Sequence, residues 1–137
     1  AVDSVVINDE EAKLLTMTHN LIKAAKKIME WGTKYVIIKK GEHGSLLFYE
    51  DVIFPSPAFS MEDIVDPTGA GDCFAGGMIG YLSSKNSTKI STIREAAVYG
   101  NIMVAFAGEK YGVYGITGLK RLDIKKRFDR YKKMVHF

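Results

Sequence analysis

The sequence feature that most constrains this fold is a glycine-rich turn that leads directly into an apolar segment. Residues 66–77 read Asp-Pro-Thr-Gly-Ala-Gly-Asp-Cys-Phe-Ala-Gly-Gly. The first half is typical of a loop, whereas residues 73–82 are small or apolar and predict a buried helix, packed closely through Gly76, Gly77 and Gly80. Backbone N–H groups at the junction would be the unpaired donors of a helix start.

The junction also has the chemistry of an anion-binding site. Gly69 and Gly71 have no side chains to keep an anion away from the backbone, and the positive end of the helix dipole lies here. Asp72 follows at once, although a carboxylate repels a neighbouring anion. One useful role for it is to accept a proton from a hydroxyl group that attacks a bound phosphate. The structural alternative is a tight turn before a buried helix, with Asp72 as a surface cap.

This run resembles the second signature of the ribokinase-like (PfkB) carbohydrate kinases, which has an Asp-x-x-Gly-Ala-Gly-Asp core. The resemblance implies that Asp72 is the catalytic base. It also implies that the backbone amides of Gly69, Ala70 and Gly71 form the anion hole for the migrating phosphoryl group. ATP and Mg²⁺ are the implied cofactors.

The resemblance implies cofactor or metal roles for two further pairs of residues, with Asn8 and Glu11 contacting the cofactor and Glu11, Asp66 and Thr68 acting on metal ions. Asn8-x-x-Glu11 follows an apparent strand at residues 4–7, and its residues predict a helix capping pair. It also resembles the family's Asn-x-x-Glu motif, whose glutamate acts on Mg²⁺ and phosphate largely through water. Both interpretations can hold together. Asp66 and Thr68 occupy positions that help to bind a monovalent cation in several relatives, so K⁺ is a further candidate.

A loop near the middle of the chain is expected to contact the nucleotide. Residues 35–38 are continuously apolar, which predicts a parallel strand buried on both faces. The Gly-x-x-Gly loop that follows leads into a second strand at 45–49, and by its residues alone it is a hairpin turn with solvated lysines. The resemblance implies that Lys39, Gly41 and Gly44 contact ATP, although many members have threonine where Lys39 stands.

Asn101 interrupts an apolar helix predicted at residues 92–106. A buried asparagine is usually a satisfied core residue. Counted from the signature, however, Asn101 falls where relatives place a polar contact to the adenosine moiety, and both interpretations stay open. Residues 108–118 are punctuated by glycines, and the family closes this loop over the adenine.

The last predicted helix, capped by Asp123, combines an apolar stripe with many basic residues. A stripe at helical spacing needs a core to bury it, so the basic residues are interpreted as the solvated outer face of a docking helix. The stripe is Ile124, Phe128, Tyr131 and Val135, and the basic residues are Lys125, Lys126, Arg127, Arg130, Lys132 and Lys133.

The order of elements predicts an α/β protein. An amphipathic helix at 21–31 ends at Gly32 and leads to the buried strand, which makes a β-α-β pattern. A short strand at 52–54, closed by two prolines, predicts a sheet edge. The resemblance implies a Rossmann-like three-layer α/β/α sandwich with a mostly parallel central sheet. We interpret residues 1–137 as the C-terminal ATP-binding and catalytic part of such a kinase, without the substrate-binding N-terminal half and lid, and expect it to be inactive alone.

Composition excludes several other classes of protein. The 137 residues are 47% hydrophobic and 26% charged, and a net charge of +3 is too small to argue for nucleic-acid binding. No apolar run approaches the ~20 residues of a membrane span. The single cysteine, Cys73, permits no intrachain disulfide and fits a reducing cytoplasm. We expect a small-molecule substrate, with neither nucleic acid nor membrane as partner, and leave open a homodimer of the full-length protein.

The predicted activity is ATP-dependent phosphorylation of a hydroxyl group on a small sugar or sugar-like substrate. A nucleoside kinase of the same family and a non-catalytic nucleotide sensor are the alternatives. A dinucleotide-dependent oxidoreductase fits less well, because Phe74 occupies the third glycine position of G-x-G-x-x-G. No G-x-x-x-x-G-K-[ST] phosphate loop occurs.

Overall fold

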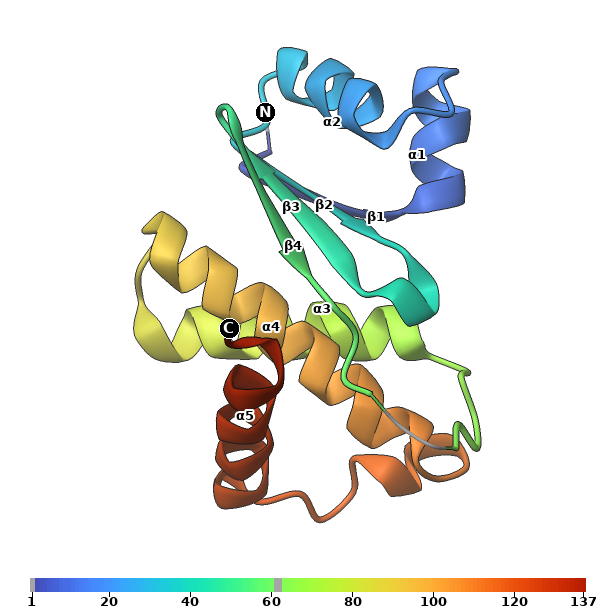
Figure 1. Cartoon of the computed structure of the whole chain (residues 1–137), viewed down its shortest axis with the longest axis vertical. Coiled ribbons are helices and arrows are strands. Elements are labelled where there is room, and N and C mark those ends of the chain that lie inside the picture. Colours follow the sequence, from blue (N-terminus) through green and yellow to red (C-terminus); the bar gives the residue numbers. More distant parts are fainter. Residues whose placement is uncertain (1, 61–62) are drawn as a thin grey trace. The chain divides into compact units, whose positions relative to one another are not determined.

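The computed structural model describes residues 2–60 and 63–137. The chain divides into two compact units, Ala1–Ser56 (unit 1) and Pro57–Phe137 (unit 2) (Figure 1). Residues 61 and 62, in the segment before the glycine-rich turn, lie outside the described residues. Within the described part of the chain, no helix is both long enough and apolar enough to cross a membrane.

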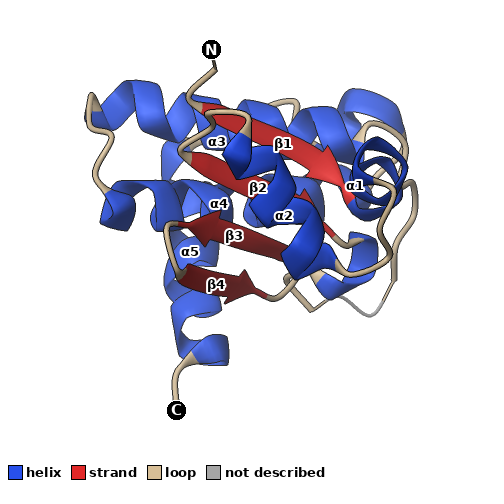
Figure 2. Ribbon diagram, turned by 90° about the horizontal axis from the view of Figure 1, so that it is seen from above, coloured by secondary structure: helices blue, strands red, loops and turns tan. Residues whose placement is uncertain are grey.

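Unit 1 is a four-stranded sheet with two helices in its first crossover. The elements in order are β1 (Ser4–Asn8), α1 (Asp9–Thr16), α2 (Leu21–Glu30), β2 (Tyr35–Lys39), β3 (Ser45–Tyr49) and β4 (Val52–Ser56), with a 3₁₀ turn at Gly41–His43 before β3. The strands lie side by side in the order β1-β2-β3-β4 (Figure 2). The predicted β-α-β pattern is confirmed, since β1 and β2 are parallel and joined through α1 and α2.

The expectation of a mostly parallel sheet holds only for β1 and β2. The β2–β3 and β3–β4 pairs are antiparallel, because their short connections can close only hairpins. The last strand was predicted to end before Pro55, but β4 continues through it to Ser56. Pro55 is tolerated there because β4 lies at the edge of the sheet. An edge strand has a hydrogen-bonded neighbour on one side only, so the N–H group that proline lacks is not needed for pairing on the other side.

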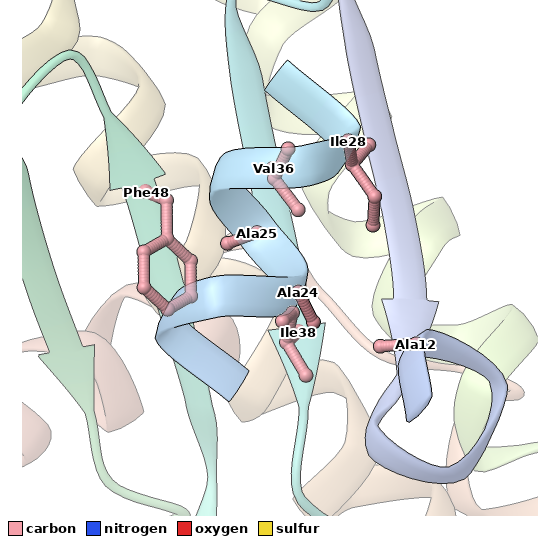
Figure 3. Packing of buried hydrophobic residues seen from close by; sticks show 7 residues of the cluster. All are labelled: Ala12, Ala24, Ala25, Ile28, Val36, Ile38 and Phe48. Atoms are coloured by element: carbon pink, nitrogen blue, oxygen red, sulfur yellow. The ribbon is translucent and has the colours of Figure 1, made fainter. Parts of the chain in front are cut away.

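The core of unit 1 lies between α2 and one face of the sheet (Figure 3). Ala24, Ala25 and Ile28 are buried on the apolar face of α2. The small alanines let the helix lie close to Val36 and Ile38 of β2. The full cluster is Ala12, Ala24, Ala25, Ile28, Val36, Ile38 and Phe48. Residues 35–38 of β2 are all buried, so the prediction of a strand buried on both faces is confirmed.

Unit 2 is built on a pair of helices, α3 (Ala70–Lys85) and α4 (Ile90–Gly108). Gly77 of α3 and Gly100 of α4 lie at their contact. A Cβ at Gly77 would lie 2.6 Å from Met103 Cγ and 3.0 Å from the carbonyl oxygen of Tyr99. A Cβ at Gly100 would lie 2.9 Å from the Phe74 ring. The two helices can therefore approach this closely only because these positions have no side chain.

The start of α3 agrees with the prediction, but the expected burial of this helix needs correction. The helix begins at Ala70, within the predicted junction of loop and helix at residues 69–72, and only Phe74 and Met78 are buried along it. Gly76 and Gly80 are exposed, and a Cβ at either would meet nothing within 4 Å. Only Gly77 of the three glycines is therefore at a close helix contact, because α3 presents one face rather than its whole circumference to α4.

The final helix, α5 (Arg121–Val135), follows a second 3₁₀ turn at Gly112–Gly115. Its N-cap is Lys120, and Asp123 caps the helix from the third position by accepting a hydrogen bond from the Lys120 N–H at 3.0 Å. Of the predicted stripe, Tyr131 is buried, and its hydroxyl donates to the carbonyl of Pro57 at 2.6 Å. The ring of Phe128 stacks on Tyr99, which stacks on Tyr81, and so connects α5 to α4 and α3.

The rest of the stripe and one basic residue depart from the expectation. Ile124 is only half-buried and Val135 is exposed, because α5 rests on the helix pair through its middle turns. Arg127 is not on a solvated face, since its side chain is only 17% exposed and pairs with Glu109. The other basic residues of the predicted face are exposed.

We expect Gly77→Ala to lower the free energy of unfolding by about 1–2 kcal/mol, because the added Cβ overpacks the contact between α3 and α4. The matched control is Gly76→Ala, one residue earlier in the same helix, where the new methyl group meets open space. That change should stabilise the chain by up to about 1 kcal/mol through helix propensity. Urea unfolding compares them, and equal shifts for the two variants would contradict the packing assigned to Gly77.

Candidate active site

The glycine-rich turn presents open backbone donors at the start of α3. Gly69 precedes the helix with a left-handed φ of +78°, a conformation that residues with a Cβ rarely adopt. The Ala70 N–H donates to the carbonyl of Pro67 at 3.2 Å, and the Cys73 N–H donates to that of Gly69 at 2.9 Å. Among the described residues, the N–H groups of Gly71 and Asp72 have no hydrogen-bond acceptor. These two donors sit at the positive end of the helix dipole and can bind an anion.

The Asp72 carboxylate lies in the first turn of α3 and is exposed. Its charge acts on the neighbouring thiol, since burial and, after it, the negative charge of Asp72 raise the pKa of Cys73 above its ordinary value of 9.0. The site therefore combines open amide donors with an ionisable oxygen one residue away. A proton acceptor beside a phosphate-binding turn is the arrangement that phosphoryl transfer to a hydroxyl group requires.

Asp66 fixes the entrance to the turn. One carboxylate oxygen accepts a hydrogen bond from the Thr68 N–H at 3.0 Å, and the other accepts one from the Gly112 N–H at 2.9 Å. These contacts hold the pKa of Asp66 below its ordinary value of 3.8, and the Gly112 amide contributes most. The contact to Gly112, 46 residues away, was not predicted. Its only signal in the sequence is a glycine among the loop residues, which here has a φ of +54°.

The backbone beside Asp66 is tied to the end of α4. The N–H groups of Val65 and Asp66 donate to the carbonyl of Gly108, at 2.8 Å and 3.3 Å. Gly115 packs against the same helix end, where a Cβ would lie 2.2 Å from the carbonyl oxygen of Phe106. The end of α4 therefore supports both the turn and the loop at 112–115.

In unit 1, the structure brings the remaining predicted residues to one end of the two parallel strands. Asn8 is the last residue of β1 and pairs in register with Lys39, the last residue of β2. Gly41 and Gly44 follow in the next loop with φ values of +55° and +85°. The carboxyl ends of parallel strands are where α/β proteins bind ligands.

Asn8 and Glu11 form the predicted capping box. The Asn8 side-chain oxygen accepts from the Glu11 N–H at 2.7 Å, and Glu11 Oε2 accepts from the Asn8 N–H at 3.0 Å. The Glu11 carboxylate is nevertheless exposed, and a carboxylate has room for further hydrogen bonds beyond this one. Such an oxygen suits the water-mediated contact with a hydrated Mg²⁺ that the resemblance implies.

The predicted site residues thus fall into two groups, one in each unit. Asn8, Glu11 and Lys39 meet at one sheet end in unit 1, and the residues from Asp66 to Asp72 form one continuous turn in unit 2. Asn101 is not part of this turn. It lies on α4 and is 6% exposed. A contact between Asn101 and a nucleotide stays a prediction.

Solved structures of other proteins share this fold. Aminoimidazole riboside kinase from Salmonella enterica, solved with aminoimidazole riboside and an ATP analog, matches with a TM-score of 0.79 and 25% identity over 95% of this chain and 42% of that chain. Fructokinase from Vibrio cholerae, solved with fructose, ADP and calcium ion, matches with a TM-score of 0.79 and 25% identity over 91% and 40%. The chain thus has the ribokinase-like α/β fold.

The sequence also matches a family model. The model of the pfkB family carbohydrate kinases matches residues 1–115, and the chain therefore belongs to this family. Cytidine kinase from Thermococcus kodakarensis is 42% identical over 79 residues, which are 57% of this chain and 28% of that protein. The chain spans less than half the length of each of these three proteins. The family resemblance drawn from the sequence is confirmed.

The contact between Asp72 and Cys73 can be tested through the thiol. We expect Asp72→Asn to speed the alkylation of Cys73 by iodoacetamide at pH 7–8, because loss of the carboxylate charge lowers the pKa of the thiol and so raises its thiolate fraction. Cys73 is the only cysteine, so mass spectrometry of the whole chain reports its rate directly. Asp63→Asn is the matched control and should leave the rate unchanged. Equal rates in all three proteins would contradict the charge effect.

Proposed function

We propose that this chain supplies the ATP-binding and catalytic part of a kinase that phosphorylates a hydroxyl group on a small sugar or sugar-like substrate. The main support for this proposal is the turn before α3, where the open N–H groups of Gly71 and Asp72 lie beside the exposed Asp72 carboxylate. Membership of the pfkB family supports the same reaction class.

The turn performs two tasks in this proposal. Asp72 accepts the proton of the attacking hydroxyl group as the new O–P bond forms, while the bond between the γ-phosphorus and the bridging oxygen breaks and ADP leaves. The amides of Gly69, Ala70 and Gly71 form the anion hole for the phosphoryl group as it is transferred. For this, the Ala70 N–H must give up its hydrogen bond to the Pro67 carbonyl and donate to the phosphoryl group instead. Fixed backbone dipoles suit this task because phosphoryl transfer depends mainly on positioning and charge stabilisation.

The unit 1 residues are assigned to the nucleotide and its metal ion. Lys39, Gly41 and Gly44 contact ATP, and the absence of a side chain at both glycines, which have positive φ values, allows the backbone to approach a ligand closely. Glu11 binds Mg²⁺ through water, and bound Mg²⁺ neutralises charge on phosphate oxygens. The capping box fixes the Glu11 carboxylate before the ligand arrives, which reduces the entropy lost on binding.

The acceptor could also be a nucleoside. The specific observation that favours this second candidate is the 42% identity to a cytidine kinase, over 79 residues. Both candidates use the same turn and the same phosphate donor, and they differ only in the acceptor. A non-catalytic nucleotide sensor would bind ATP without transferring phosphate to either class.

The central test replaces the proposed base. In the full-length polypeptide that contains this chain, we expect Asp72→Asn to lower kcat by about 10²–10⁴-fold, because the hydroxyl group loses its proton acceptor. Binding of ATP should be nearly unchanged, since the backbone donors remain. ADP release from ATP and Mg²⁺ across a sugar and nucleoside panel measures the rate and identifies the acceptor.

Two outcomes of this test would contradict the proposal. Wild-type turnover in Asp72→Asn would remove Asp72 from the mechanism. ATP binding without ADP release for any acceptor would favour the sensor instead.

The metal-binding role of Glu11 can be separated from its capping role. Glutamine also serves at this position of a capping box, so Glu11→Gln should keep the helix start and the free energy of unfolding. Loss of the carboxylate charge should lower turnover by about 10–100-fold and raise the Mg²⁺ concentration needed for half-maximal rate. Asn8→Ala is the structural control, with an expected loss of stability of about 0.5–2 kcal/mol. An unchanged Mg²⁺ dependence in Glu11→Gln would exclude the metal role.

A further inference from the structure

Arg127 makes the most specific contact of α5 with the rest of unit 2. Its Nη2 lies 2.7 Å from Glu109 Oε1, and its guanidinium lies 3.6 Å from the centre of the Phe106 ring and 5.0 Å from that of Phe59. Both rings are 7% exposed. A half-buried guanidinium needs a charged partner and suitable packing to offset the water it loses, and Arg127 has both.

Two of the residues that Arg127 contacts, Phe106 and Glu109, lie at the end of α4, which also holds the turn at residues 66–72. Phe106 and Glu109 flank Gly108, whose carbonyl accepts hydrogen bonds from the Val65 and Asp66 N–H groups. The same end of α4 packs against Gly115 in the loop that supplies the Gly112 donor to Asp66. A shift of this helix end would therefore change both supports of Asp66.

A short series of contacts continues from Asp66 into the anion-binding turn. The Asp66 carboxylate accepts from the Thr68 N–H, and Pro67 accepts from the Ala70 N–H. Gly69 and the open donors of α3 follow at once. The position of these donors thus depends on where Asp66 is held.

We propose that Arg127 is a positioning residue, which fixes the turn at residues 66–72 by clamping the end of α4 through Glu109 and Phe106. The importance of the turn for catalysis rests on the proposed function, whereas the clamp itself does not. Arg127 lies outside residues 1–115, the part of the chain that the family model matches. The arginine of the clamp is therefore supplied by α5, outside the matched segment, whereas its partners Phe106 and Glu109 lie within that segment.

Amide hydrogen exchange on the 137-residue chain tests the clamp without any activity. In Arg127→Ala, we expect the Val65, Asp66 and Gly112 amides to exchange about tenfold faster. A factor of this size corresponds to a typical interaction free energy between contacting residues. The Ile102 amide, in the middle of α4, reports on global unfolding and should change less. Arg130→Ala is the matched control, because its guanidinium is exposed and lies 5.4 Å from the Phe59 ring. Its exchange should resemble that of the wild type.

Two milder variants keep the test decisive if Arg127→Ala does not fold. Glu109→Gln removes the ion pair but leaves the arginine packed on the rings, and should speed exchange at the same three amides. Arg127→Lys keeps the charge and should restore part of the protection. Exchange that rises equally at every amide, or at none, would overturn the clamp.

Kinetics of the full-length polypeptide then separate the clamp from the proposed reaction. Arg127→Ala should lower kcat by about tenfold while the KM for ATP stays close to the wild-type value, because the nucleotide contacts assigned to unit 1 are intact. If Arg127→Ala speeds amide exchange at the three positions but keeps the wild-type kcat, Arg127 has no positioning role in the reaction. Failure of the kinase proposal would instead show in Asp72→Asn, and the exchange result would still decide the clamp.

Discussion

The close approach of α3 and α4 is the contact on which unit 2 depends. Gly77 and Gly100 permit it, since a Cβ at either would come within 3.0 Å of the opposite helix. The helices are joined by a short connection, so α4 returns across α3 and its end lies near the start of α3 (Figure 1). The Gly108 carbonyl can therefore bind the two amides that precede the glycine-rich turn. The open donors of that turn owe their position to a helix contact elsewhere in the unit.

The same groups stabilise local structure and are available for chemistry at both candidate sites. Glu11 closes a capping box with one oxygen, yet its carboxylate stays exposed. Asp66 uses both oxygens to join the turn to the loop at Gly112. A carboxylate held by N–H groups loses little further freedom when a cation binds, so structural hydrogen bonds of this kind prepare a site in advance.

The C-terminal helix has a larger part in this arrangement than its basic composition suggests. A stack of Tyr81, Tyr99 and Phe128, with ring centres 4.2 Å and 4.6 Å apart, joins α3, α4 and α5. Arg127 adds a charged contact at the end of α4. Phe128 belongs to the predicted apolar stripe, whereas Arg127 was predicted to lie on the solvated face. Their effect comes from the elements that they connect.

Sequence alone predicted the local structures, including the helix start with its open N–H donors at the turn. Three local features depend only on residues that are neighbours in the chain: the Asn8 cap, the buried strand at 35–38 and the junction of glycines and aspartate before α3. Short-range sterics and hydrogen bonding are enough to predict such features. Tertiary structure decided which glycines lie at a helix contact, that β3 and β4 are antiparallel, and that Asp66 bonds to Gly112 and Arg127 to Glu109. These contacts join residues up to 46 positions apart. Local patterns carry no information on which distant partner folding will bring within hydrogen-bond distance.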